Sequence, residues 1–310
     1  MKKAIFVAVL MAMVGAFSVA AIAQNKSREE SLNEIAALTK TKKPEDQAKA
    51  YELGKEYLKR FGSEKDKGTK QVAAFVDHYR EDSFYKAVDN KKLDEAFSLG
   101  NELLAENPNN VPVLMNLAYT GFNGLAVGNN THAAESIKVS DKAIELILAG
   151  KGPSNYAPFK DKNMALAWLN YINAMISQTT NLKLAAAHMY QALQYPSEIK
   201  DNVDPYHFIA FYYEESYTAA EEALGKKVAA KTISDAERKT EEDNINKILD
   251  FALDAYARAI KVADTTKNTK ATELRKRLTQ ILKFRKGTDA GMEDFIKFTA
   301  NSPMPDPAKQ

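Results

Sequence analysis

The stretch "NPNNVPVLMNLAY", residues 107–119, decides the fold class. Pro108-Asn109-Asn110 ends one helix and starts another, because proline cannot continue a helix and asparagine is a favourable helix cap. Leu114, Leu117 and Ala118 then follow at helical spacing, three and four residues apart, on one face of the new helix. The stretch therefore predicts two successive helices joined by a short turn.

The composition of the whole chain is typical of an all-α protein. It contains only 13 Gly, and no stretch sustains the apolar–polar alternation of a strand. The prolines lie mostly at the edges of helical segments, and the last three, Pro303, Pro305 and Pro307, mark a loose tail. We expect the folded part of the chain to be helical throughout.

An internal repeat organises these helices. "AYELGKEYL" at residues 50–58 aligns without a gap with "AFSLGNELL" at residues 96–104. Small residues at this spacing let a neighbouring helix approach closely, as stacked hairpins require. The repeated pattern has a small residue, a second small residue four positions later, and an apolar or small residue three positions after that. It is approximated at five places: Ala50/Gly54/Tyr57, Ala96/Gly100/Leu103, Ser136/Ser140/Ala143, Ala185/Met189/Ala192 and Ala252/Tyr256/Ala259.

These positions resemble the two-helix unit of the tetratricopeptide repeat (TPR) family. Leu114, Leu117 and Ala118 match the W, L and G positions of its first helix, and Pro108 matches its closing proline. Trp168, Tyr206 and Tyr213 lie at first-helix positions of further units. The resemblance implies an all-α, TPR-like α-solenoid of about five helical hairpins, with a capping helix near residues 269–286.

The spacing of the repeats is longer than that of the family. Successive second helices are separated by 40 residues from Leu103 to Ala143, and by 49 from Ala143 to Ala192. A further 67 residues separate Ala192 from Ala259, whereas the family repeats every ~34 residues. The extra length lies around residues 124–131, 150–158 and 225–244. An irregular helical bundle is the alternative architecture.

The chain begins with a bacterial-type export signal. Lys2 and Lys3 precede an apolar run, and Ala21-Ile22-Ala23 forms an A-x-A cleavage site. We expect cleavage after Ala23 and a periplasmic or secreted protein with no membrane insertion afterwards; retention of residues 4–23 as an anchor is the alternative. The expected organisation is a signal peptide over 1–23, a TPR-like domain over 24–286, and a short helix and Pro-rich tail over 287–310.

The charge balance and the cysteine content narrow the range of functions that the chain can have. Without residues 1–23 the chain carries 41 basic and 41 acidic residues, which gives no electrostatic case for nucleic acid. The absence of Cys excludes disulfides and a thiolate nucleophile. We find no zinc-protease, nucleophile-elbow or phosphate-loop motif, and the four His are far apart in sequence. We therefore expect a protein that is not an enzyme and that needs neither cofactor nor metal.

Aromatic residues offer the best candidate site. "YHFIAFYYEESY", residues 206–217, concentrates more aromatic side chains than one helix can bury. First helices line the concave groove in TPR proteins, so the resemblance implies a groove that holds a protein or peptide of the cell envelope. Counted from the matched positions, the residues that would bind this partner are Met115, Tyr119, Phe122, Asn173, His207 and Phe211, with Leu169 beside them.

A different function stays open for the same segment. Glu214 and Glu215, together with Glu221 and Glu222, follow the aromatic residues on the predicted helix, where paired carboxylates can do acid–base chemistry. The alternative to a noncatalytic scaffold is therefore a small-ligand-binding protein or an enzyme with a cleft at helix 206–217. A solute screen by thermal shift separates the two, because a bound ligand raises the melting temperature by mass action.

Overall fold

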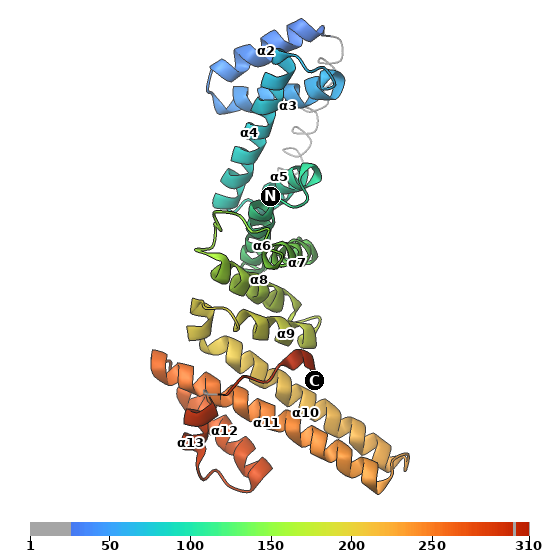
Figure 1. Ribbon diagram of the computed structural model, residues 1–310, viewed down its shortest axis with the longest axis vertical. Coiled ribbons are helices and arrows are strands. Elements are labelled where there is room, and N and C mark those ends of the chain that lie inside the picture. Colours follow the sequence, from blue (N-terminus) through green and yellow to red (C-terminus); the bar gives the residue numbers. More distant parts are fainter. Residues whose placement is uncertain (1–25, 300–301, 310) are drawn as a thin grey trace, which may run out of the picture. The chain divides into compact units, whose positions relative to one another are not determined.

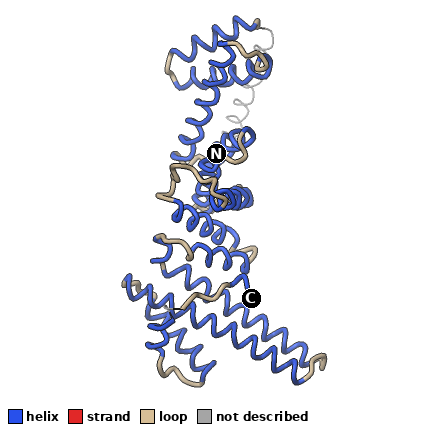
Figure 2. The backbone as a smooth tube through the Cα atoms, viewed as in Figure 1, coloured by secondary structure: helices blue, strands red, loops and turns tan. Residues whose placement is uncertain are grey.

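The computed structural model describes residues 26–299 and 302–309, and within them all regular structure is helical (Figures 1 and 2). Twelve α-helices and two short 3₁₀ helices follow one another along the described chain. The predicted export signal lies outside the described residues. The described chain belongs to two compact units, which meet in sequence between Glu106 and Asn107.

The first unit contains two helix pairs. Helix α2 pairs with α3, and α4 pairs with both α3 and α5. Local signals set the helix starts: Ser27 and Glu30 form a capping box before α2, and Asp66 accepts hydrogen bonds from the first N–H groups of α4. The bounds are Arg28–Lys40 for α2, Pro44–Phe61 for α3, Lys67–Asp89 for α4 and Leu93–Glu106 for α5.

The second unit contains three helix pairs and a C-terminal cap. The pairs are α6 with α7, α8 with α9, and α10 with α11, whereas α12 and α13 both pack on α11. The bounds of the pairs are Val111–Ala126 and Ala133–Leu148, Lys162–Ser177 and Leu182–Ala192, and Val203–Ala229 and Asp235–Thr266. The bounds of the remaining elements are Ala271–Lys286 for α12, Met292–Thr299 for α13, Glu198–Asp201 for η1 and Pro307–Lys309 for η2.

This architecture confirms the predicted fold class, an all-α, solenoid-like series of helix pairs. The opening stretch behaves as expected: α5 ends at Glu106, and Asn110 caps α6 by accepting a hydrogen bond from the Val113 N–H at 3.3 Å. The predicted capping helix over residues 269–286 is α12. The sequence predicted one repeat domain over 24–286, whereas the contacts divide this range into two units at residue 106.

The small residues of the repeated pattern lie at helix contacts. Ala50, Ala96, Ala185 and Ala259 have no exposed surface. Gly54 shows why small residues are needed there, since a Cβ added to it would lie 2.6 Å from Val76 Cγ2 of the neighbouring helix α4. The pattern therefore reports close helix approach, which is the physical basis of the predicted repeat.

The three long intervals have different structures. Residues 127–132 and 149–161 are turns and loops, as their glycine and proline content suggests. Residues 225–244 are instead mostly helical, with α10 and α11 joined by a short turn at residues 230–234 (Figure 2). Ser234 and Glu237 form a capping box that starts α11 inside the charged segment. The extra residues here lengthen one hairpin.

No helix among the described residues combines the length and apolar character needed to cross a membrane.

Candidate functional site

Aromatic side chains of the second unit form a connected cluster on α6, α8 and the loop before α8. The ring centroids of Trp168 and Tyr171 lie 5.6 Å apart, and Phe122 lies 6.1 Å from Trp168 and 6.0 Å from Tyr171. Tyr119 lies 6.3 Å from Trp168, with its ring nearly perpendicular to the indole. Phe159, from the loop, stacks on Trp168 at 6.4 Å. Edge-to-face and stacked contacts of this kind hold the rings in place.

The cluster continues into a groove between α8 and α10. The groove has a volume of about 320 Å³, and Tyr171 belongs to both the cluster and the groove. It is lined by Tyr171, Met175, Gln178, Met189, Asp204, Pro205, His207, Phe208 and Phe211. We use the name aromatic face for the partly exposed rings of these three helices: Tyr119, Phe122, Trp168, Tyr171, Phe208 and Phe211.

Helical periodicity explains why these rings share one surface. Tyr119 and Phe122 are three residues apart on α6, as are Trp168 and Tyr171 on α8 and Phe208 and Phe211 on α10. Residues three or four apart lie on the same side of a helix. Because α6, α8 and α10 are the first members of three successive pairs, their corresponding sides form one stripe.

Polar groups at the edge of the aromatic face are already paired. The Trp168 indole N–H donates to Glu198 Oε1 at 2.7 Å. Burial, reinforced by the charge of Asp204, raises the pKa of Tyr171, so this phenol stays neutral near neutral pH. Asp204 itself forms an ion pair with Lys270. The face is therefore an apolar and aromatic surface whose bordering carboxylates, Glu198 and Asp204, are each engaged by another side chain.

A second groove adjoins the first across His207. Its volume is about 320 Å³, and it lies between α10 and α12 with Tyr256 of α11 at its base. Here Glu214 accepts hydrogen bonds from Tyr256 and Arg277. The carboxylate is thus neutralised by a guanidinium, and burial together with Glu214 raises the pKa of Tyr256.

Four of the six predicted partner-binding residues lie at this surface. Tyr119 and Phe122 belong to the aromatic cluster, His207 lines both grooves, and Phe211 is 46% exposed in the first groove. The other two do not: Met115 and Asn173 have no exposed surface, and neither does Leu169.

The burial of these residues follows from how the helices pack. Helix α6 contacts both α7 and α8, and α8 contacts α6, α7 and α9, so each is covered on more than one side. The Asn173 amide donates to Asp141 Oδ1 of α7 at 2.6 Å, within the helix interface. Met115 and Asn173 are therefore interior residues and contribute no accessible contact surface.

The sequence prediction missed four contributors: Trp168, Tyr171, Met175 and Phe208. Trp168 matches a first-helix position of the repeat pattern, which the family uses for packing. The signal that could have identified them is the spacing of Trp168, Tyr171 and Met175 on α8, three and four residues apart, opposite a buried stripe.

The two acidic residues within 206–217 lie in different environments. Glu214 is occupied by Tyr256 and Arg277, and Glu215 is exposed on the outside of α10. In the described part of the chain, no group of three or more His, Asp or Glu side chains is placed to hold a metal ion. His188 lies in a helix interface, where its Nδ1 is 3.1 Å from Asn170 Oδ1.

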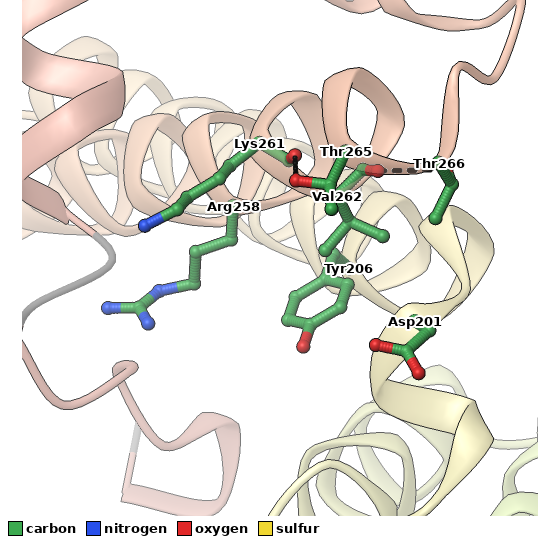
Figure 3. Close-up of a pocket in the computed structure, with 7 residues that line it drawn as sticks. All are labelled: Asp201, Tyr206, Arg258, Lys261, Val262, Thr265 and Thr266. Atoms are coloured by element: carbon green, nitrogen blue, oxygen red, sulfur yellow. Dashed lines mark hydrogen bonds between the residues drawn. The ribbon is translucent and has the colours of Figure 1, made fainter.

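A third cavity, of about 240 Å³, lies beside α11 and is lined by Tyr206, Arg258 and Lys261, among others (Figure 3). Its two threonines are already engaged, since the Thr265 hydroxyl donates to the Lys261 carbonyl at 2.9 Å and the Thr266 hydroxyl to the Val262 carbonyl at 2.8 Å. Arg258 is bound to Asp254 at 2.6 Å. The hydroxyl groups of both threonines and the Arg258 guanidinium are thus held by other groups of α11.

Comparison of the chain with models of known protein families, with curated proteins and with solved structures gave no match.

Proposed function

We propose that this chain is an exported, noncatalytic TPR-like scaffold that binds a protein or peptide partner of the cell envelope through its aromatic face. One observation carries the proposal: half-buried aromatic rings from three successive first helices form a continuous stripe that ends in an apolar groove. Scattered exposed apolar residues are common on proteins, whereas a contiguous patch is typical of an interaction surface.

The chemistry of the aromatic face defines the partner segment. Aromatic residues and Met provide interface area with adaptable packing, and they dominate the binding energy of many interfaces. The groove between α8 and α10 accepts one bulky apolar side chain, while the rings on α6 and α8 extend the contact along the same ligand. A helical or extended peptide with apolar residues on one side fits this surface.

A small apolar ligand is the second candidate occupant. The groove volume of about 320 Å³ lies within the range of about 300–1,000 Å³ that is typical of small-molecule sites. Gln178, Asp204 and His207 supply a few polar groups among apolar ones. A solute that stabilises the chain in a thermal-shift screen, but not the Phe211→Ala variant, would favour this occupant.

The scaffold function is tested by site-specific photo-cross-linking in the native cell envelope. A photoreactive phenylalanine analogue replaces Phe211 in the groove and, as a matched control, Phe284, which is 71% exposed on α12. We expect a discrete cross-linked partner from position 211 and none of that identity from position 284. Equal cross-linking from both positions, or no discrete product from position 211, would contradict the proposal.

A further inference from the structure

Residues 302–306 are not helical and lead into the short 3₁₀ helix η2 at residues 307–309. This segment, 302–309, contains three prolines and lies against the helices of the second unit. Figure 1 shows this dark-red segment running toward α9, and η2 packs against α9. The sequence "SPMPDPAK" contains prolines at alternate positions, a spacing that favours an extended backbone and excludes a longer helix.

Two side chains of the helices bind the backbone of this segment. Arg258 of α11 donates from one Nη atom to the Thr299 carbonyl at 2.8 Å and to the Ser302 carbonyl at 2.7 Å. The Tyr213 hydroxyl of α10 donates to the Pro305 carbonyl at 3.2 Å. The Ser302 and Pro305 carbonyls flank prolines and are satisfied by these donors, whereas the Thr299 carbonyl also accepts from the Ser302 N–H at 3.2 Å and from its hydroxyl at 2.8 Å.

Apolar contacts accompany the hydrogen bonds. Met304 packs against the core cluster of the second unit, and Pro307 is buried. Asp306 accepts from the Ala308 N–H at 2.9 Å and so closes the turn that begins η2. Hydrogen bonds to the ligand backbone combined with pockets for alternate side chains are the usual means of binding an extended peptide.

The donors are held in place by groups other than the tail. Arg258 is clamped by Asp254 of the same helix, with Nε to Oδ1 at 2.6 Å, and both side chains are largely buried. Tyr213 has no exposed surface, and its ring contacts Tyr212 and Phe251 at 5.3 and 5.5 Å. Because helix residues position these donors, we expect the surface to keep its form when the tail leaves it, as a preorganised binding site does.

We propose that this surface, the tail site formed by α9, α10 and α11, binds extended, proline-containing peptides, and that residues 302–309 are its resident ligand. A segment of a partner protein with prolines at alternate positions binds by displacing the tail. The tether gives the resident segment an effective concentration of the order of millimolar, so a partner present at a lower concentration displaces it only if it binds correspondingly more tightly.

The tail site is separate from the aromatic face. Its donors come from α10 and α11, and its apolar contacts involve α9, whereas the aromatic face uses α6, α8 and other positions of α10. The inference therefore does not rest on the proposed function, and failure of one leaves the other standing.

A binding experiment with the full chain tests the tail site. The variant Pro307→Asp places a charge at a buried position and should release the tail without altering the helices. The probe is a fluorescent peptide with the sequence of residues 302–310. We expect saturable binding to the released variant and at least about tenfold weaker binding to the unmodified chain, whose own tail competes. Faster amide hydrogen exchange in residues 302–310 shows that the tail is released. If Pro307→Asp perturbs the fold, Met304→Asp is the alternative variant for releasing the tail.

Matched tyrosine variants give the specificity control. In the released background, Tyr213→Phe removes the hydroxyl that binds Pro305 and should weaken the peptide several-fold. Tyr217→Phe, on the same helix, should leave affinity unchanged. If the peptide does not bind saturably to a chain whose tail is shown to be released, the proposal is wrong and the tail is only a structural cap. Peptide affinity that is unchanged by Tyr213→Phe would equally overturn the inference. So would a dimer of the unmodified chain that dissociates on Pro307→Asp, because the tail site would then bind the tail of a second copy.

Discussion

Phe211 and Tyr213 lie two residues apart on α10 in opposite environments. Phe211 is 46% exposed in the groove, while Tyr213 has no exposed surface. The sequence predicted that some of the aromatic residues in 206–217 must remain accessible, because one helix face cannot bury them all. Counting from the repeat selected His207 and Phe211, but the composition of the segment alone could not separate Phe211 from its aromatic neighbours Tyr212 and Tyr213, because several helical registers fit.

This difference predicts opposite effects of truncation on stability. Tyr213→Ala should lower the free energy of unfolding by about 3–5 kcal/mol, because it removes a fully packed ring from the core. Phe211→Ala removes a ring that is already about half in water, and it should cost less than about 1.5 kcal/mol. Urea denaturation of both variants measures the two changes in the free energy of unfolding. Equal losses would place Phe211 in the core and remove it from the aromatic face.

Buried polar residues at the α8/α9 interface make a second prediction. Burial lowers the pKa of His188 below its ordinary value of 6.5, although the charge of Asp141 acts in the other direction. The unfolded chain therefore binds this proton more readily, and the folded state should lose stability as the pH falls below about 6.5.

The test compares thermal unfolding of the parent and His188→Gln between pH 7.5 and 5. The parent should lose more stability over this interval than the variant does. Identical pH dependence would show that His188 does not titrate differently in the two states. His78, which is exposed on α4, offers His78→Gln as the control.

At the scale of helices, the sequence predicted starts and close contacts better than lengths. Capping residues and small residues act locally, so Asn110, Ser234 and Gly54 could be interpreted from their neighbours alone. The lengths of α10 and α11 could not be predicted in this way, because residues 225–244 are charged and contain a glycine, a composition that also suits a loop. What decides their structure is pairing between the two long helices, a contact that local sequence does not encode.

Two glycines within helices separate packing from propensity. Gly54→Ala should destabilise the chain by about 1–3 kcal/mol, because its Cβ would lie 2.6 Å from Val76 Cγ2, and Val76 is a buried, β-branched residue with little freedom to move. Gly225→Ala in α10 meets no atom within 4 Å and should stabilise by up to about 1 kcal/mol through helix propensity.

Circular dichroism during chemical denaturation measures both glycine variants in the full chain. A stabilised Gly54→Ala would show that α3 and α4 approach less closely than the repeated small-residue pattern indicates.

At the scale of the whole molecule, the repeat pattern predicted the fold class but not how the pairs group. The contacts divide the chain at residue 106, within the very turn whose proline and asparagines predicted a new helix pair. The candidate site was predicted in part. Counting from the repeat placed Tyr119, Phe122, His207 and Phe211 at the surface, but it also selected Met115 and Asn173, which neighbouring helices cover. Long intervals between repeats change which sides of a helix are covered, and no local pattern reports that.

Trp168 allows the central claim to be measured directly. It is the single tryptophan of the chain and lies within the aromatic face, in contact with Tyr119, Phe122 and Tyr171. Its emission therefore reports on the proposed site and on no other part of the molecule. A ligand that covers the face should change the environment of the indole and of its hydrogen bond to Glu198.

The decisive measurement is a tryptophan-fluorescence titration with the peptide identified by cross-linking at position 211. Binding through the aromatic face predicts a saturable change in Trp168 emission. It also predicts that Phe211→Ala raises the dissociation constant by about fivefold or more, corresponding to about 1 kcal/mol or more, while the free energy of unfolding falls by less than about 1.5 kcal/mol. Phe284→Ala should leave the titration unaltered. Peptide binding that leaves Trp168 emission constant, or that Phe211→Ala does not weaken, would contradict the account.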